Sequence, residues 1–221
     1  MTRPRSTSQA ARRQPPELPD DIEVLREVGA EALASGGPIE DARAARLELG
    51  AGELAALMLA TCELAHVAMP GSVVRRVVLR DVRLVHCDLS NAVWRGSEAR
   101  RVEFIDCRMT GMRVAESKWE HVLLRGCDAR YAQFNASALR RCEFRATRLD
   151  EADLRGTDLR EAVFEDASLC RADLGGARLQ GTDLRGATLD GLAVRAEDVR
   201  GAVVTAAQAL ELARLLGLVI R

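Results

Sequence analysis

An apolar residue occurs at every fifth position of the chain from Leu49 to Val204 without interruption. This column holds 32 residues and includes all four Phe and both Trp of the sequence. Two positions before each of them lies a second column, of small or apolar residues, in which Glu197 alone is charged. An α-helix repeats about every 3.6 residues and a strand every second residue, so neither fits a strict period of five. The chain must therefore turn a corner every five residues, with two side chains pointing inwards and three outwards.

The clearest stretch of this pattern is residues 152–191, which read ADLRG TDLRE AVFED ASLCR ADLGG ARLQG TDLRG ATLDG. It resembles the tandem A-(D/N)-L-x-x consensus of the pentapeptide-repeat family, and the resemblance extends over residues 42–204. The resemblance implies an all-β fold, a right-handed quadrilateral β-helix with four pentapeptides per coil and a narrow solid core. Since the column holds 32 repeats, we expect about eight coils and, at about 4.8 Å per stacked strand, a rod about 38 Å long.

The N-terminal part of the chain lies outside the repeats. Residues 1–18 are rich in Arg and Pro and predict a disordered basic tail. Residues 19–41 predict a capping segment, with an acidic helix over Asp20–Ala34 that covers the open strand edges of the first coil. Residues 42–204 then form the repeat region, whose last coil we expect to be distorted because Glu197 breaks the inward column.

Residues 205–221 follow a different period. Thr205 and Gln208 form a T-x-x-Q capping box, which predicts the start of a short C-terminal helix. This segment looks like the C-terminal helix through which the gyrase-protecting branch of the family, of the Qnr and MfpA type, dimerises. An isologous contact between two such ends would bury both the helix and the open coil edge. We therefore expect a homodimer with the dimerisation residues Leu210, Leu212, Ala213, Leu216 and Leu218.

The sequence gives little sign of catalytic or cofactor chemistry. No Ser or Cys has a His and an acid at plausible positions, no glycine-rich phosphate loop precedes a helix, and a solid rod offers no pocket. His66, His86 and Asp106 recur at the same place in successive coils and would stack on one face, either as a weak surface metal site or as a solvated ladder. We expect a non-enzymatic protein without a cofactor. Five of the six cysteines lie in the inward column, where a thiol acts as a small hydrophobic group: Cys62, Cys87, Cys107, Cys127 and Cys142.

The charges are balanced, with 32 Lys and Arg against 33 Asp and Glu. Acids often precede the central apolar residue of a repeat and Arg often follows it, which predicts walls laced with ion pairs. One side of the rod departs from this balance and is the candidate interaction face. Its cations are Arg80, Arg100, Arg101, Lys118, Arg140, Arg141, Arg160 and Arg200.

These features favour a non-enzymatic rod that presents a rigid surface to a protein partner, which the sequence does not identify. The alternative, implied by the Qnr and MfpA resemblance, is a DNA-mimicking modulator of DNA gyrase, a type II topoisomerase, that confers fluoroquinolone or toxin resistance. A DNA mimic needs a strongly anionic surface, which a neutral repeat region does not provide. A second alternative is nucleic-acid binding through the Arg-rich face, which the lack of outward aromatic residues apart from Tyr131 disfavours.

The compartment follows from features that the sequence lacks. No apolar stretch reaches the length of a membrane span, and no signal-peptide core follows the N-terminus. We therefore expect a cytoplasmic protein without a membrane partner. The excess of Arg over Lys and the abundance of Ala suggest a bacterial source.

Overall fold

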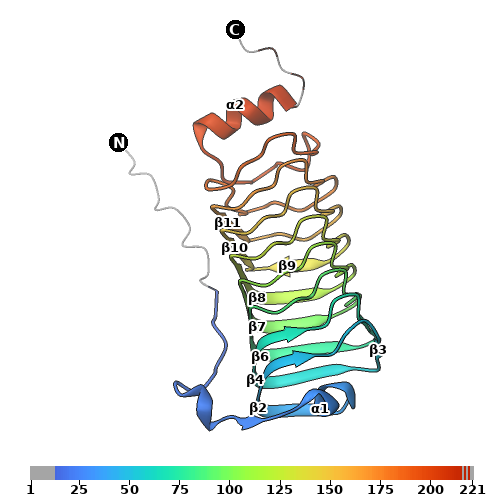
Figure 1. Ribbon diagram of the computed structural model, residues 1–221. Helices are drawn as coiled ribbons and strands as arrows, with labels where there is room; N and C mark the ends of the chain where they lie inside the picture. The colour runs from blue at the N-terminus through green and yellow to red at the C-terminus, as the bar shows by residue number, and fades with distance from the viewer. Residues whose placement is uncertain (1–12, 216, 218, 220–221) are drawn as a thin grey trace.

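The computed structural model describes residues 13–215, 217 and 219, and its chain winds into a rod of stacked coils (Figure 1). Its strands are parallel, and each pairs with the strand at the same place in the neighbouring coil. On one face the ladder climbs from Pro38 to Arg178 in seven steps of one coil each. The predicted fold class, an all-β right-handed quadrilateral β-helix with a short C-terminal helix, is confirmed. The rod has about seven turns where we expected eight, because residues 196–201 form successive turns in place of a further rung.

Long strands occupy the N-terminal half of the rod and short ones the C-terminal half. The inward small column holds Val at several positions in the first half and none in the second, where Ala predominates, and Val favours extended strands more than Ala does. The strands are β1 (Arg26–Glu27), β2 (Pro38–Glu48), β3 (Glu53–Leu54), β4 (Leu57–Ala68), β5 (Val73–Val74), β6 (Val77–Val85), β7 (Glu98–Ile105), β8 (Lys118–Arg125), β9 (Ala138–Arg140), β10 (Glu143–Arg145) and β11 (Val163–Glu165). The main sheet has the order β1-β2-β4-β6-β7-β8-β10-β11, with β9 beside β8, and β3 pairs with β5 in a second sheet.

The core is a single column of side chains along the axis of the rod. Aromatic rings stack through its middle, with centroid distances of 5.4 Å between Phe104 and Trp119 and 5.8 Å between Trp119 and Phe134. Ala99 lies one rung below Trp119 and leaves room for the indole. Most polar members of the small column are hydrogen-bonded: Thr182, for example, donates its hydroxyl to the carbonyl of Leu159 at 2.7 Å. Ser72 is the exception, since its buried hydroxyl has no partner among the described residues. The five predicted inward cysteines are buried free thiols.

Corners of the coil fall at positions whose numbers end in 1 or 6. Residues at these corners adopt a left-handed backbone, with φ of 55° at Asp81, 51° at Arg101, 57° at His121 and 52° at Arg141. A residue other than glycine in this region costs about 1–2 kcal/mol, which the repeated stacking must offset. Because these four corners occupy the same place in successive coils, their side chains form one column along an edge of the rod.

The N-terminal segment differs from the expectation of one helix over residues 20–34. It forms a 3₁₀ turn at Ile22–Val24, strand β1, and a five-residue helix α1 (Ala30–Ala34). The helix begins only after Gly29, because β1 pairs with β2. The backbone groups of β1 therefore bond to the first coil, whereas in a longer helix they would bond within the helix. Leu33 is buried at 1% exposure and packs onto the end of the core.

We expected residues 1–18 to be disordered, and this is wrong for residues 13–18. These residues run in an extended conformation along the rod (Figure 1). There Arg13 forms an ion pair with Glu103 at 2.9 Å. The sequence suggested disorder because it is proline-rich and basic, but the rod supplies the acidic partners. Residues 1–12 of the predicted tail lie outside the described residues.

The C-terminal helix α2 (Ala206–Leu215) lies across the end of the rod (Figure 1). The predicted capping box is present, since the main-chain N–H of Gln208 donates to Thr205 Oγ1 at 3.2 Å and that of Thr205 donates to Gln208 Oε1 at 2.9 Å. The predicted distortion of the last coil is also present, with Glu197 exposed and Asp198 buried in its stead. Within the described part of the chain, no helix is long and apolar enough to cross a membrane.

Candidate interaction surface

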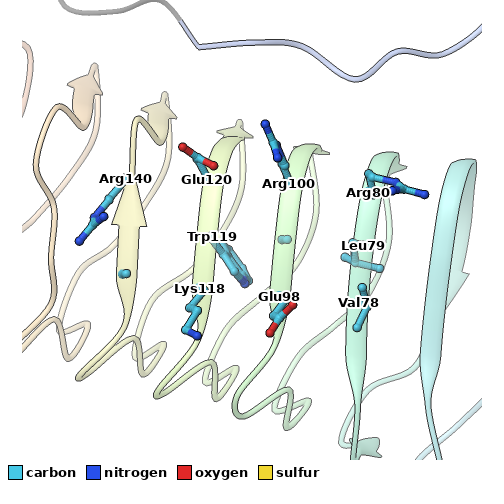
Figure 2. Close-up of a pocket in the computed structure, with 11 residues that line it drawn as sticks. Val78, Leu79, Arg80, Glu98, Arg100, Lys118, Trp119, Glu120 and Arg140 are labelled. Atoms are coloured by element: carbon cyan, nitrogen blue, oxygen red, sulfur yellow. The ribbon is translucent and has the colours of Figure 1, made fainter.

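One face of the rod carries a hollow of about 600 Å³, formed over strands β6, β7, β8 and β9 (Figure 2). We call it the basic hollow. Outward side chains from neighbouring rungs make two rows along it, while inward residues and the short side chain of Ala138 form its floor. Its lining residues are Val78, Leu79, Arg80, Glu98, Ala99, Arg100, Lys118, Trp119, Glu120, Ala138 and Arg140.

The floor of the basic hollow is held rigidly from within. Trp119 is 2% exposed, and its indole N–H donates to Ser97 Oγ at 3.0 Å. Phe104 and Phe134 pack against the same indole ring. A hydrogen-bonded side chain inside a close-packed column has a single rotamer. A partner that binds above this floor therefore loses no free energy to ordering its side chains.

The cations of the basic hollow differ from most others on the rod. Arg80, Arg100 and Lys118 are exposed and form no ion pair with any described residue, whereas Arg140 pairs with Asp158 at 2.7 Å. The acids of the lining are Glu98 and Glu120, so the lining carries four positive and two negative charges. Unpaired cations keep their full charge for a ligand, so this surface favours an anionic partner.

Elsewhere the predicted ion-pair lacing is present. Asp128, Asp153, Asp158 and Asp183 each bind the guanidinium two residues further along through both carboxylate oxygens. These contacts hold the pKa of the four carboxyls below the usual range. Charges paired in this way are largely neutralised as seen by an approaching molecule.

The structure brings together half of the predicted interaction face. Arg80, Arg100, Lys118 and Arg140 line the basic hollow, while Arg141 and Arg160 lie beside it with Glu120 and Glu161. The other two predicted members line neither group. Arg101 stands at a corner and binds Asp81, with Nη2 and Oδ2 2.5 Å apart, and Arg200 lies in the turns at 196–201. The sequence could not separate paired from unpaired cations, because several pairs join residues of different coils.

The candidate metal ladder does not assemble. The His66 and His86 rings stack with centroids 5.0 Å apart, but Asp106 Oδ1 occupies the space that a Cβ at Gly126 would take, so the Asp106 carboxylate extends towards the next coil. No cluster of three His, Cys, Asp or Glu side chains suited to a metal ion occurs among the residues that the structure describes.

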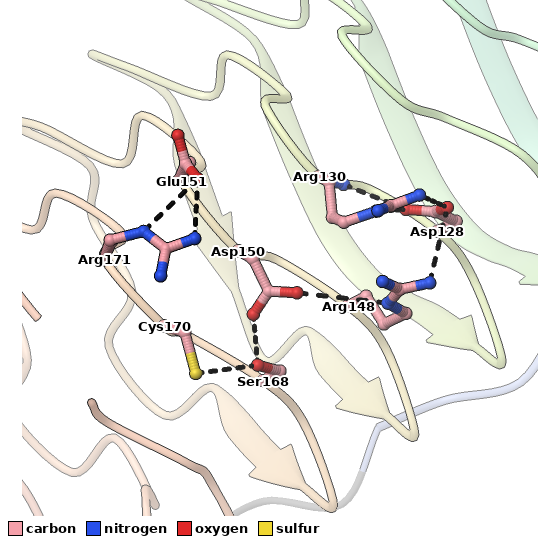
Figure 3. Close-up of polar contacts among 8 residues, drawn as sticks. All are labelled: Asp128, Arg130, Arg148, Asp150, Glu151, Ser168, Cys170 and Arg171. Carbon is pink, nitrogen blue, oxygen red and sulfur yellow. Dashed lines mark hydrogen bonds and ion pairs between the residues drawn. The ribbon is translucent and has the colours of Figure 1, made fainter. Parts of the chain in front are cut away.

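The most exposed thiol lies in a polar cluster near the C-terminal half of the rod (Figure 3). Ser168 donates its hydroxyl to Asp150 and lies 3.3 Å from the sulfur of Cys170. Arg171 is held by Glu151 at 2.7 Å and belongs to the ion-pair lacing. The groups in this cluster satisfy one another, and they bring no histidine to the thiol within the described residues.

The predicted dimerisation residues are divided between the core and the surface. Leu212 is buried at 6% exposure against the last coil, Leu210 is 51% exposed, and Ala213 is half-buried. Leu216 and Leu218 lie outside the described residues. The helix thus caps the rod with Leu212 while leaving Leu210 to the solvent.

Models of known families match most of the rod. One described as "Pentapeptide repeat region" matches residues 57–134 and 77–154, and one described as "Pentapeptide repeats (8 copies)" matches residues 147–186. Together these matches cover more than half of the chain. A comparison with curated proteins finds no match.

Solved structures with a similar course of the chain are distant in sequence. A trypsin-treated variant of QnrB1, a plasmid-mediated fluoroquinolone resistance protein, is 22% identical over 89% of this chain and 95% of its own, with a TM-score of 0.43. HetL, a pentapeptide repeat protein involved in heterocyst differentiation regulation from the cyanobacterium Nostoc, is 19% identical over 76% of this chain and 90% of its own, with a TM-score of 0.33. At these identities and TM-scores the family assignment rests on the sequence matches.

Proposed function

The chain belongs to the pentapeptide-repeat family, and we propose on this basis that it is a non-enzymatic rod that presents a rigid surface to a protein partner. The basic hollow is the surface it uses. The observation that carries the proposal is the group of exposed cations Arg80, Arg100 and Lys118, which pair with no acid among the described residues and surround a floor fixed by Trp119. Such a surface fits an acidic protein surface from which an apolar side chain projects into the hollow.

A protein fits the basic hollow better than a nucleic acid does. Glu98 and Glu120 stand among the cations and would repel a phosphate backbone, whereas a protein surface can place its own donors beside them. Tyr131, at 51% exposure, is the one exposed side chain of the Phe, Tyr and Trp class among the described residues, so this face has no such ring on which bases could stack.

A charge-reversal experiment tests this proposal. We expect the immobilised wild-type protein to retain a partner from native lysate, and the Arg100→Glu/Lys118→Glu variant to retain at least about tenfold less, because like charges then face the acidic partner. The control is Arg113→Glu/Arg125→Glu, which changes the net charge equally. The ladder neighbours of Arg113 are Val93 and Gln133, and those of Arg125 are Ile105 and Arg145. None of these neighbours is an acid, and neither arginine forms an ion pair with a described residue. Equal retention by both variants would contradict the use of the hollow.

The same charge distribution predicts no action on DNA gyrase. Competing for a basic DNA-binding groove requires anionic surface, and here the acids are neutralised by neighbouring arginines, as Asp153 is by Arg155. We expect neither inhibition of supercoiling nor protection from a fluoroquinolone at low-micromolar protein. Half-inhibition in that range, relieved by reversing the charges of Glu161, Glu165 and Asp166, would favour the DNA-mimic function instead.

We further propose that α2 mediates a homodimer. Leu210 is 51% exposed on the helix and Val203 is 41% exposed beside the last coil, so an isologous contact would bury both. Sedimentation should show a dimer for the full chain and a monomer for Leu210→Glu, which leaves the capping residue Leu212 in place. Deleting residues 205–221 should give monomer or aggregate. A full-length chain that sediments as a clean monomer at micromolar concentration would contradict the proposal.

A further inference from the structure

Residues 13–17, with the sequence Arg-Gln-Pro-Pro-Glu, lie along the column of corner residues beside the basic hollow (Figures 1 and 2). The side chains they contact come from four different coils. Arg13 pairs with Glu103 at 2.9 Å and with Glu143 at 3.6 Å, and its side chain is only 11% exposed. We call the set of contacted residues the corner seam, which consists of Asp81, Arg101, Glu103, His121 and Glu143.

From Gln14 to Glu17, every main-chain N–H of this segment is bonded. The N–H of Gln14 donates to His121 Nδ1 at 3.2 Å, and the N–H of Glu17 donates to Asp81 Oδ1 at 2.9 Å. The two residues between them are Pro15 and Pro16, which have no N–H. A segment with ordinary residues at these two positions would leave two donors facing the seam without partners.

The spacing of these two hydrogen bonds matches the repeat of the rod. His121 and Asp81 occupy the same corner two coils apart, a separation of about 9.6 Å at about 4.8 Å per rung. Gln14 and Glu17 are three positions apart, and three residues of polyproline II conformation span about 9.3 Å. A polyproline II chain parallel to the axis can therefore bond to alternate coils in register.

We propose that the corner seam is a binding site for an extended peptide of the form Arg-x-Pro-Pro-acidic, which the chain's own residues 13–17 occupy and which such a segment of a partner protein can occupy in their place. Glu103 and Glu143 recognise the arginine, Asp81 and His121 accept from the main chain, and Arg101, 3.7 Å from Glu17, recognises the acidic residue. This site is distinct from the basic hollow and does not depend on the function proposed for it.

Recognition at His121 requires the neutral imidazole, because Nδ1 accepts a hydrogen bond there. His121 is buried at 4% exposure, and this burial lowers its pKa, as do Arg141, Arg100 and Arg13, while Glu120 opposes them. Since the bound state holds the neutral form, binding is fully present above the ordinary histidine pKa of about 6.5 and weakens as the pH falls below it. Protonated Nδ1 would turn from acceptor to donor and face the Gln14 N–H.

The test uses a fluorescent peptide with the sequence of residues 13–18 and the full chain in two forms. The first is the wild type, in which the chain's own segment fills the seam at high effective concentration. The second is Arg13→Ala/Pro16→Gly, which weakens that segment without touching the seam; Pro16→Gly alone serves if the double variant is unstable. Fluorescence anisotropy should show saturable binding to the loosened chain, at least about tenfold tighter than to the wild type.

Peptide-side and seam-side controls distinguish recognition from general charge attraction. A peptide with Ala in place of its Arg should bind at least about tenfold more weakly, and a scrambled peptide of the same composition should bind no better than that. Binding of the original peptide should weaken from pH 7.5 to pH 5, and His121→Gln, which keeps an acceptor oxygen, should remove this dependence. Failure to bind the loosened chain, or equal binding of the original and scrambled peptides, would overturn the proposal.

Discussion

Ala162→Arg is expected to abolish folding, and Arg155→Ala is expected to leave the melting temperature almost unchanged. Ala162 is fully buried in the inward column, one coil above Cys142 and one below Thr182. The described residues of the core cluster around it are all uncharged. The desolvation of an unpaired guanidinium costs several kcal/mol even after relaxation, and close packing leaves no room for the side chain. A domain has a net stability of only about 5–15 kcal/mol, so this single change is enough to unfold the protein. Arg155 is 61% exposed and lies in the ion-pair lacing.

Circular dichroism and thermal unfolding measure this effect, and Ala162→Ser provides the matched control at the same position. Thr157 and Thr182 in the same column donate their hydroxyls to the carbonyls of Phe134 and Leu159, at 3.1 Å and 2.7 Å. A serine at 162 has the corresponding carbonyl of Leu139 available and should be tolerated. If the Arg and Ser variants were equally stable, the inward assignment of this column would be wrong.

Trp119→Ala is expected to lower the free energy of unfolding by about 3–5 kcal/mol, which is typical of a large aromatic side chain removed from a core. The indole is 2% exposed and packs between Phe104 and Phe134, and its neighbour one rung below is Ala99, which is too small to fill the space. The surrounding strands are fixed by ladder hydrogen bonds on both sides, so the cavity cannot collapse. Denaturant unfolding measures the loss.

A comparison of the two tryptophans separates packing from hydrogen bonding. Trp119 donates to Ser97 Oγ, whereas the indole N–H of Trp94 is buried without a partner among the described residues. Trp119→Phe should therefore destabilise the protein more than Trp94→Phe, since only the first change loses a hydrogen bond. Equal effects of the two Phe variants would mean that the Ser97 contact contributes nothing to stability.

The period of five predicted the fold because it acts on every residue at once. A side chain that points inwards in one coil must point inwards at the same place in the next, so the apolar and small columns determine the coil, the core and the positions of the cysteines. The same columns predicted the distortion at Glu197. The coil count was too high because the columns continue through residues 195–204, where the apolar pattern persists but residues 196–201 form turns and the ladder resumes only at Val203, which bridges Asp183.

The sequence could not predict the contacts that join different coils to the chain ends. The seam at Asp81, His121 and Glu143 is built from residues of different coils, and their match to residues 13–17 depends on the rise of the coil. The charge of the basic hollow depends on which arginines pair with an acid, and Arg101 does not line the hollow because it stands at a corner and pairs with Asp81.

Four residues of the candidate face share one hollow, and their role in binding a partner stays a prediction. Arg80, Arg100, Lys118 and Arg140 line the hollow together, because equivalent outward positions of successive coils share a face. Which of these cations pair with a described acid could not be predicted in the same way, since pairing depends on how far each acidic side chain reaches across the coils.

Site-specific photo-crosslinking tests most directly whether the basic hollow is where a protein partner binds. A photoreactive amino acid replaces either exposed Lys118, within the hollow, or exposed Arg113, on another face, in cells that naturally make the protein. We predict a discrete protein adduct from position 118 that Arg80→Glu/Arg100→Glu abolishes, and none from position 113. Adducts of equal yield from both positions, or an adduct from position 113 alone, would contradict this prediction.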